Sequence, residues 1–182
     1  MRTTSSTTGV CIFLTGLSGA GKSTIATALD NAIRTTLKRA VTLLDGDVVR
    51  THLSKELGFS RTDRDTNIER IAFVASEVVK HGGIVISAAI APYDAARAAA
   101  RRRIEANGRF VLVHLSTPLA VCETRDTKGL YAKARRGEIE RFTGVTDAYE
   151  LPSRAELTID TSTSSIDDAV AMLLATITKD DA

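Results

Sequence analysis

The feature that most constrains this chain is a glycine-rich stretch near its start, G-L-S-G-A-G-K-S-T, from Gly16 to Thr24. It fits the pattern G-x-x-x-x-G-K-[ST], follows an apolar, β-branched run at 10–15, and precedes apolar residues spaced four apart. Strand, glycine loop and helix in this order point backbone N–H groups and a helix N-terminus toward one centre. We therefore expect the loop to bind phosphate, because a turn that only connects strand to helix needs neither the lysine nor the hydroxyl.

The pattern also predicts what individual loop residues do. We expect Lys22 to contact the outer phosphates of a nucleotide and the Ser23 hydroxyl to join the coordination of Mg²⁺. Such loops occur in GTPases, ATPase motors and small-molecule kinases. No N-K-x-D motif for guanine follows a later strand, and a motor needs a longer chain, so a small-molecule kinase is favoured. The residues predicted to bind the nucleotide are Gly19, Ala20, Gly21, Lys22, Ser23 and Thr24.

Apolar segments of strand length alternate with amphipathic helical segments along the chain. Right-handed crossovers place helices on both faces of a parallel sheet, so this alternation predicts a three-layer α/β fold with a five-stranded parallel sheet. The segment from about 126 to 150 breaks the pattern, because it is polar, basic and without a clear strand, which is typical of a lid over a site. The expected strands are 10–15, 40–45, 84–89, 110–115 and 157–160.

Composition excludes several other classes. The 182 residues are 43% hydrophobic and 25% charged, which suits one domain from residue 9, with 1–8 as a flexible tail. A net charge of +2 gives no reason to expect nucleic acid or a membrane surface as a partner. No apolar run approaches the roughly 18 residues of a membrane span, and the start lacks the apolar core of a signal peptide, so a cytoplasmic location is expected. The cysteines and histidines lack metal-ligand spacing and are interpreted as structural.

Two aspartates end the second predicted strand, in D-G-D at 45–47, on the sheet edge that carries the phosphate loop. One carboxylate there is suited to orient or deprotonate an acceptor hydroxyl, and the other to hold metal-bound water. The alternative is an Asp-Gly turn that caps the next helix. The predicted catalytic residues are therefore Lys22, Asp45 and Asp47.

Phe59 and Phe142 lie in otherwise polar loops, where core residues are not expected. Two such rings are suited to clamp a flat ligand, with nearby arginines binding its anionic groups, although ordinary packing is the alternative. Arg101, Arg102 and Arg103 point in three directions around a helix, which predicts solvent exposure and no single basic patch.

The chain resembles the adenylylsulfate (APS) kinases, a family of P-loop kinases. The resemblance rests on G-L-S-G-A-G-K-S-T, D-G-D-x-x-R, L-G-F-S-x-x-D-R-x-x-N-I-x-R, K-G-L-Y-x-K-A-R-x-G-x-I-x-x-F-T-G and Y-E-x-P, in that order, from about residue 9 to 152. It implies transfer of the γ-phosphate of MgATP to the 3′-hydroxyl of adenosine 5′-phosphosulfate (APS), giving the 3′-phosphorylated product PAPS and ADP. The cofactors implied are ATP and Mg²⁺.

The resemblance also implies roles for residues outside the phosphate loop. Asp47 is the acidic group nearest the acceptor hydroxyl, with Asp45 beside it, and Arg125 lies near the ATP base. The two phenylalanines sandwich the APS adenine, and other residues bind the phosphosulfate and ribose. The residues implied on the APS side are Arg50, Phe59, Arg64, Asn67, Ile90, Lys133 and Phe142.

Some positions depart from the family pattern. Ala91 stands where many relatives have a serine proposed to be phosphorylated, and this predicts direct in-line transfer. Val48, Ala148 and Leu151 replace an asparagine and two prolines without removing a charge that the mechanism needs.

The sequence also leaves two alternative functions open. One is a kinase for another hydroxylated metabolite, such as a sugar acid, and the other is a non-catalytic nucleotide sensor that regulates a sulfate-activating partner. We expect a homodimer, and a sulfate adenylyltransferase as a partner, because family members are often fused to one.

Overall fold

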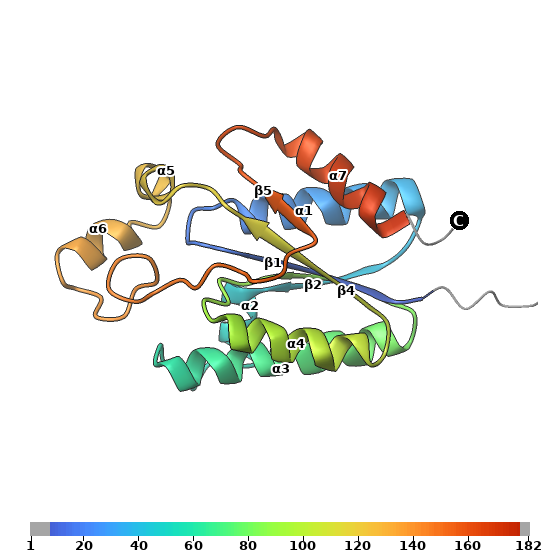
Figure 1. Cartoon of the computed structure of the whole chain (residues 1–182), viewed down its shortest axis with the longest axis horizontal. Helices are drawn as coiled ribbons and strands as arrows, with labels where there is room; N and C mark the ends of the chain where they lie inside the picture. Colours follow the sequence, from blue (N-terminus) through green and yellow to red (C-terminus); the bar gives the residue numbers. More distant parts are fainter. Residues whose placement is uncertain (1–7, 179–182) are drawn as a thin grey trace, which may run out of the picture.

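The computed structural model describes residues 8–178, which form a central parallel sheet between two helical layers (Figure 1). The strand order is β2-β3-β1-β4-β5, and all paired strands run parallel. The predicted α/β fold with a five-stranded parallel sheet is confirmed. The tail predicted for 1–8 lies, apart from Thr8, outside the described residues. The strands are β1 (Val10–Gly16), β2 (Val41–Asp45), β3 (Ile84–Ala88), β4 (Arg109–Leu115) and β5 (Leu157–Ile159).

The helices cover both faces of the sheet (Figure 1). Helices α1 and α7 lie on one face, and α3 and α4 pack side by side on the other. The helices are α1 (Lys22–Ala32), which continues into a π-helical turn η1 (Ile33–Leu37), then α2 (Gly46–His52), α3 (Arg61–Lys80), α4 (Asp94–Glu105), α5 (Leu119–Arg125), α6 (Leu130–Arg135) and α7 (Ile166–Thr178).

Successive side chains of the central strand β1 point to opposite faces of the sheet, and each face has its own apolar core. Ile12 and Leu14 belong to the apolar cluster under α1 and α7, whereas Cys11 and Phe13 belong to the cluster under α3 and α4. All four side chains are fully buried, because successive residues of a strand point to opposite faces of the sheet. This explains why β1 reads as a continuous apolar run.

The strand register brings three loops to one edge of the sheet. Ala88 pairs with Leu14 of β1 on one side and with Asp45 of β2 on the other. β2 and β3 end level with Leu14, and β1 ends two residues later at the same edge of the sheet, so the phosphate loop, the D-G-D turn and the loop that follows β3 are neighbours. β1 also lies between β3 and β4, where the strand order reverses, and ligands of such sheets bind at this point.

The segment 126–150 contains one short helix, α6, and is otherwise irregular apart from one bridge between Thr143 and Asp147. The pattern did not indicate α6, because its six residues are too few to show a helical period. The Asp126 carboxylate accepts the N–H groups of Tyr131 and Ala132, each at 3.0 Å, and so fixes the first turn. We call this segment the lid.

The predicted exposure of all three consecutive arginines of α4 is wrong for Arg101, which is 8% exposed. Its guanidinium donates two 2.8 Å bonds to the Glu156 carboxylate and lies 4.8 Å from the ring centre of Phe110. The helical spacing gives the directions of the side chains, but only the packing of the chain before β5 covers this one.

Candidate active site

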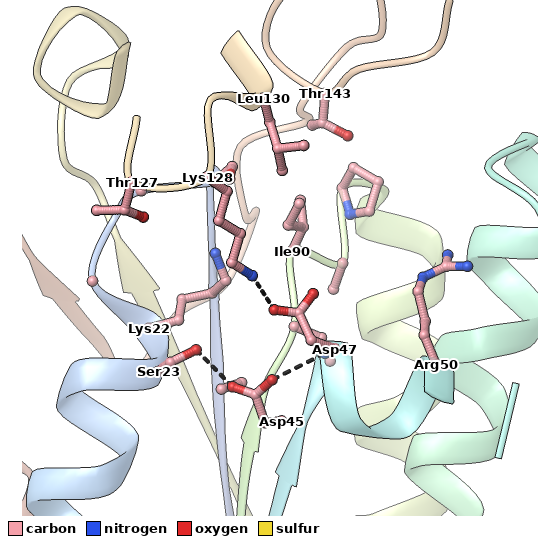
Figure 2. Close-up of a pocket in the computed structure, with 18 of the residues that line it drawn as sticks. Lys22, Ser23, Asp45, Asp47, Arg50, Ile90, Thr127, Lys128, Leu130 and Thr143 are labelled. Carbon is pink, nitrogen blue, oxygen red and sulfur yellow. Dashed lines mark hydrogen bonds and ion pairs between the residues drawn. The ribbon is translucent and has the colours of Figure 1, made fainter. Parts of the chain in front are cut away.

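A cavity of about 770 Å³ opens at the sheet edge where the three loops meet. The phosphate loop forms one wall, the D-G-D turn and the loop after β3 form the floor, and the start of α3 and the lid form the rest (Figure 2). Six cationic side chains and only two carboxylates line it, although the net charge of the whole chain is only +2. The cations are Lys22, Arg50, Arg64, Arg125, Lys128 and Arg141, and the carboxylates are Asp45 and Asp47.

The phosphate loop has the backbone that its glycines predict. Gly19 and Gly21 adopt φ of 76° and 92°, which a residue with a Cβ adopts only under strain. Gly21 is the N-cap of α1 and makes no side-chain cap, so the first N–H groups of the helix remain for a ligand.

Lys22 lies under this loop and is largely buried. Its Nζ donates to the carbonyls of Gly16 at 2.9 Å and Leu17 at 2.7 Å. Burial lowers the pKa of the Lys22 ammonium to about 8, with Asp45 and Asp47 opposing the shift. A bound phosphate would favour the charged form of this lysine.

The aspartate pair connects the phosphate loop to the lid (Figure 2). Ser23 Oγ donates a 2.6 Å hydrogen bond to Asp45 Oδ2, while Asp45 Oδ1 accepts the N–H of Asp47 at 3.0 Å and caps α2. Asp47 is exposed toward the cavity and forms an ion pair with Lys128 of the lid. The D-G-D turn therefore both caps α2 and lies at the site. The sequence alone left these two roles as alternatives.

Ser23 and Asp45 together offer the hydroxyl and carboxylate oxygens that Mg²⁺ prefers, next to the expected phosphate position. Within residues 8–178, no group of three His, Cys, Asp or Glu side chains is arranged to hold a metal on its own. This donor set fits a metal that is also bound by substrate phosphates and water.

Phe59 and two arginines form the opposite wall. The Phe59 ring is half-exposed, with the guanidinium carbons of Arg50 and Arg64 at 4.5 and 5.5 Å from its centre. Arg50 is held in place by the carbonyls of Leu57 and Gly58, at 3.2 and 2.9 Å. An aromatic face flanked by fixed cations suits a flat, anionic ligand.

The start of α3 positions the next two residues. A capping box between Ser60 and Asp63 sets the first turn, so that Arg64 and Asn67, one turn apart, both line the cavity. Arg64 is 7% exposed and reaches the lid, where it donates a 2.7 Å bond to the carbonyl of Arg141 and lies 3.6 Å from Asp147. Burial lowers the pKa of the Arg64 guanidinium, although Asp147 opposes this.

The second aromatic residue, Phe142, differs from Phe59 in its surroundings. It is 8% exposed and meets the Tyr131 ring edge-on, with ring centres 4.9 Å apart. Phe142 still lines the cavity, so both rings predicted to clamp a ligand lie at one site. The lid therefore contributes a packed ring, and the loop before α3 contributes an exposed one.

The loop after β3 forms the floor of the cavity with Ile90 and Ala91. Ala91 has φ of 45°, an unfavourable conformation that costs about 1–3 kcal/mol for a residue with a Cβ. Thr15 Oγ1 donates a 2.6 Å bond to the Ile90 carbonyl and contacts the Tyr149 hydroxyl at 2.9 Å. This strain persists because several neighbours hold the loop.

Arg125 lies at the far end of the phosphate loop. Its guanidinium donates to the Gly19 carbonyl at 3.1 Å and to the side chain and carbonyl of Thr161 at 2.8 and 2.9 Å. Thr161 and Ser164, which follow β5, line the cavity beside it. The sequence pattern did not identify these two residues, because they belong to no motif.

Two predicted residues are not brought to the cavity surface. Lys133 is exposed on α6 and does not line the cavity, where Lys128 is the lysine of the lid. Ala20 is fully buried, and its N–H donates to the Leu17 carbonyl at 3.2 Å. The remaining predicted residues, Gly19, Gly21, Lys22, Ser23, Thr24, Asp45, Asp47, Arg50, Phe59, Arg64, Asn67, Ile90, Arg125 and Phe142, all line it.

Among the described residues, no helix is both long enough and apolar enough to cross a bilayer.

Comparisons with known proteins identify the family of this chain. The family model for adenylylsulphate kinase matches residues 8–160. A sulfate adenylyltransferase of Aspergillus oryzae is 56% identical over 160 residues, which cover 88% of this chain and 28% of that protein. The chain thus spans somewhat over a quarter of the length of the curated relatives that it matches.

Solved structures extend the match to nearly the whole chain. The Mycobacterium tuberculosis APS kinase, in complex with AMPPNP and APS, is 38% identical with a TM-score of 0.88, covering 94% of this chain and 98% of that one. The hexameric APS kinase from Thiobacillus denitrificans is 43% identical with a TM-score of 0.73, covering 97% of this chain and 30% of that one. The chain belongs to the adenylylsulphate kinase family.

Proposed function

We propose that this chain transfers the γ-phosphate of ATP to the 3′-hydroxyl of adenosine 5′-phosphosulfate, producing PAPS and ADP. The observation that carries the proposal is a single cavity with a phosphate loop on one wall, an aromatic and arginine wall opposite, and an aspartate pair between them. Its excess of cations suits two anionic ligands that meet end to end. The family assignment names the acceptor that such a cavity takes.

The phosphate loop binds ATP in this proposal. The N–H groups of Gly19 and of residues 21–24 cradle the phosphates, Lys22 contacts the outer ones, and Arg125 lies beside the base. Ser23 would hold Mg²⁺ directly and Asp45 would hold its bound water, and the ion would supply positive charge that offsets the charge developing on the phosphates. Thr161 and Ser164 complete the nucleotide wall.

APS binds against the opposite wall. Its adenine lies between Phe59 and Phe142, and Arg50, Arg64 and Asn67 contact the phosphosulfate and ribose. Exposure of the Phe59 ring and the fixed guanidinium groups beside it support this arrangement. Ile90 contributes an apolar contact from the floor, and Lys133 joins only if the lid moves inward.

Asp47 orients the acceptor hydroxyl and takes its proton. The 3′-oxygen then forms a bond to the γ-phosphorus as the bond from that phosphorus to the β-phosphate oxygen breaks, and ADP leaves with the electron pair. Lys128, which now pairs with Asp47, is free to contact a phosphate when the hydroxyl approaches that carboxylate. Fixed charge and positioning supply most of the acceleration, since phosphoryl transfer needs little covalent help from the protein.

The transfer is direct and in line, because alanine at position 91 cannot carry a phosphate. The test is the stereochemistry at a chiral γ-phosphorus. Direct transfer inverts the configuration, whereas a phosphoenzyme on any residue gives overall retention and contradicts the proposal.

The activity itself is tested by ADP release in a coupled assay with APS, with gluconate and with no acceptor, together with identification of PAPS. We expect turnover with APS alone. Turnover with gluconate would identify a sugar-acid kinase, and tight ATP binding without turnover would identify a nucleotide sensor.

The partners remain part of the proposal. We expect a homodimer that takes APS from a sulfate adenylyltransferase in the cytoplasm. The Aspergillus protein is a sulfate adenylyltransferase, and the Thiobacillus enzyme is hexameric. Light scattering during gel filtration measures the oligomeric state and contradicts the dimer if the mass is that of a monomer or hexamer.

A further inference from the structure

Helix α4 carries two buried arginines one helical turn apart, Arg97 and Arg101, which are 1% and 8% exposed. Neither lines the cavity. Burial of a guanidinium is costly unless its donors are satisfied, so the partners of each arginine show what it holds together.

Arg97 joins the loop just before its own helix to the end of the lid, which is far away in the chain. Its Nη1 donates a 2.6 Å hydrogen bond to the carbonyl of Ala91, in the floor of the cavity. Its Nη2 donates to the carbonyl of Glu150, where the lid ends, at 2.6 Å, and to Asp94 Oδ1 at 3.0 Å. The guanidinium carbon also lies 5.6 Å from the ring centre of Tyr149.

The groups around Arg97 bind the same two segments to each other. The N–H of Glu150 donates to the Pro92 carbonyl, and the Glu150 carboxylate accepts the N–H of Asp94, both at 2.8 Å. The Tyr149 hydroxyl contacts Thr15, which in turn holds the Ile90 carbonyl. The strained loop of the cavity floor and the end of the lid are therefore one hydrogen-bonded unit with Arg97 at its centre.

We infer that Arg97 is a positioning residue for the acceptor side of the site, which fixes the loop 90–92 against the end of the lid at 149–150. This inference rests on the proposed function. The planar guanidinium reaches two carbonyls and a carboxylate at once, and a lysine ammonium at the same position cannot match that geometry. Arg97 makes no hydrogen bond to the phosphate loop, so its effect falls on the acceptor and not on ATP.

Arg101 provides a matched control on the same helix. It binds Glu156 and Glu105 and lies over Phe110, and none of these residues lines the cavity. Arg97→Lys and Arg101→Lys therefore both disturb a buried guanidinium, but only Arg97→Lys acts on a segment that lines the cavity.

Steady-state kinetics and thermal unfolding of the two variants test the inference. For Arg97→Lys we expect the KM for APS to rise about tenfold, because the variant loses about one charge-assisted hydrogen bond. The KM for ATP should stay within about twofold of the wild-type value. For Arg101→Lys we expect a similar fall in unfolding temperature with both KM values unchanged. Equal rises in both KM values for Arg97→Lys, or an unchanged KM for APS, would overturn the inference.

Tyr149→Phe covers the case in which Arg97→Lys does not fold, since it removes only a hydroxyl contact of the same unit. We expect the KM for APS to rise about threefold, and no rise would contradict the inference. A second readout separates this inference from the proposed function. Faster tryptic cleavage of the ligand-free lid in Arg97→Lys than in Arg101→Lys supports the anchoring role even if the wild-type protein does not phosphorylate APS, and equal cleavage rates contradict it.

Discussion

Ser23 Oγ donates a 2.6 Å hydrogen bond to Asp45 Oδ2, which ties the first turn of α1 to the end of β2. Gly21 caps α1 without a side chain, so the first N–H groups of the helix mark the expected phosphate position. The Ser23 hydroxyl and the Asp45 carboxylate meet directly beside it. One contact thus places both oxygen donors of the proposed Mg²⁺ site.

Ser23→Ala and Asp45→Asn should each raise the Mg²⁺ concentration required for half-maximal activity by about tenfold or more, because each removes an oxygen that holds the ion or its water. Asparagine is still a good N-cap, so Asp45→Asn should leave the unfolding temperature almost unchanged. The measurement is initial rate against Mg²⁺ at fixed ATP. Thr35→Ala, on an exposed part of η1, is the control, and an unaltered Mg²⁺ requirement in both site variants would exclude this metal site.

Nucleotide binding should take up protons at pH 8. Lys22 has a pKa of about 8 in the ligand-free protein, and a bound phosphate raises that pKa by favouring the ammonium form. Since about half of the Lys22 side chains are neutral at a pH equal to their pKa, uptake should approach half a proton per MgADP at pH 8 and vanish near pH 6.5. Calorimetry in two buffers of different ionisation enthalpy measures it. Lys22→Arg should abolish this uptake, and uptake that persists in that variant would assign it to another group.

Phe59→Ala should raise the KM for APS about tenfold or more and leave the KM for ATP unchanged, because a ring that stacks on a base contributes about 1–3 kcal/mol. The matched control is Phe73→Ala, since Phe73 is also 54% exposed but lies outside the cavity. The same KM for APS in both variants would mean that the acceptor does not stack on Phe59.

Ligands should protect the lid from trypsin. It carries cleavable bonds after Lys128, Lys133, Arg135, Arg136 and Arg141, and ADP with APS should slow cleavage there by ordering the segment over the cavity. Cleavage after the exposed Arg154, just beyond the lid, serves as an internal control and should change little. Protection of that bond to the same degree would indicate stabilisation of the whole chain rather than of the lid.

The local features of this fold follow from residues close together in the sequence. Strand runs, helical spacing and the positions of glycine predict the parallel sheet and the phosphate loop, because backbone geometry and burial repeat over a few residues. Parallel order then places Gly21 and Asp45 at one sheet edge. The sequence therefore determined the site's location and, through its motifs, most of the side chains that line it.

Other features depend on contacts between distant residues. Lys128 meets Asp47 across 81 positions, Arg97 joins α4 to the end of the lid, and Lys133 lies outside the cavity that Lys128 enters. Arg101 is buried by a segment that no pattern in its own helix reveals. A helical period gives the direction of a side chain, but tertiary packing decides what lies in that direction, and so only the structure could identify these partners.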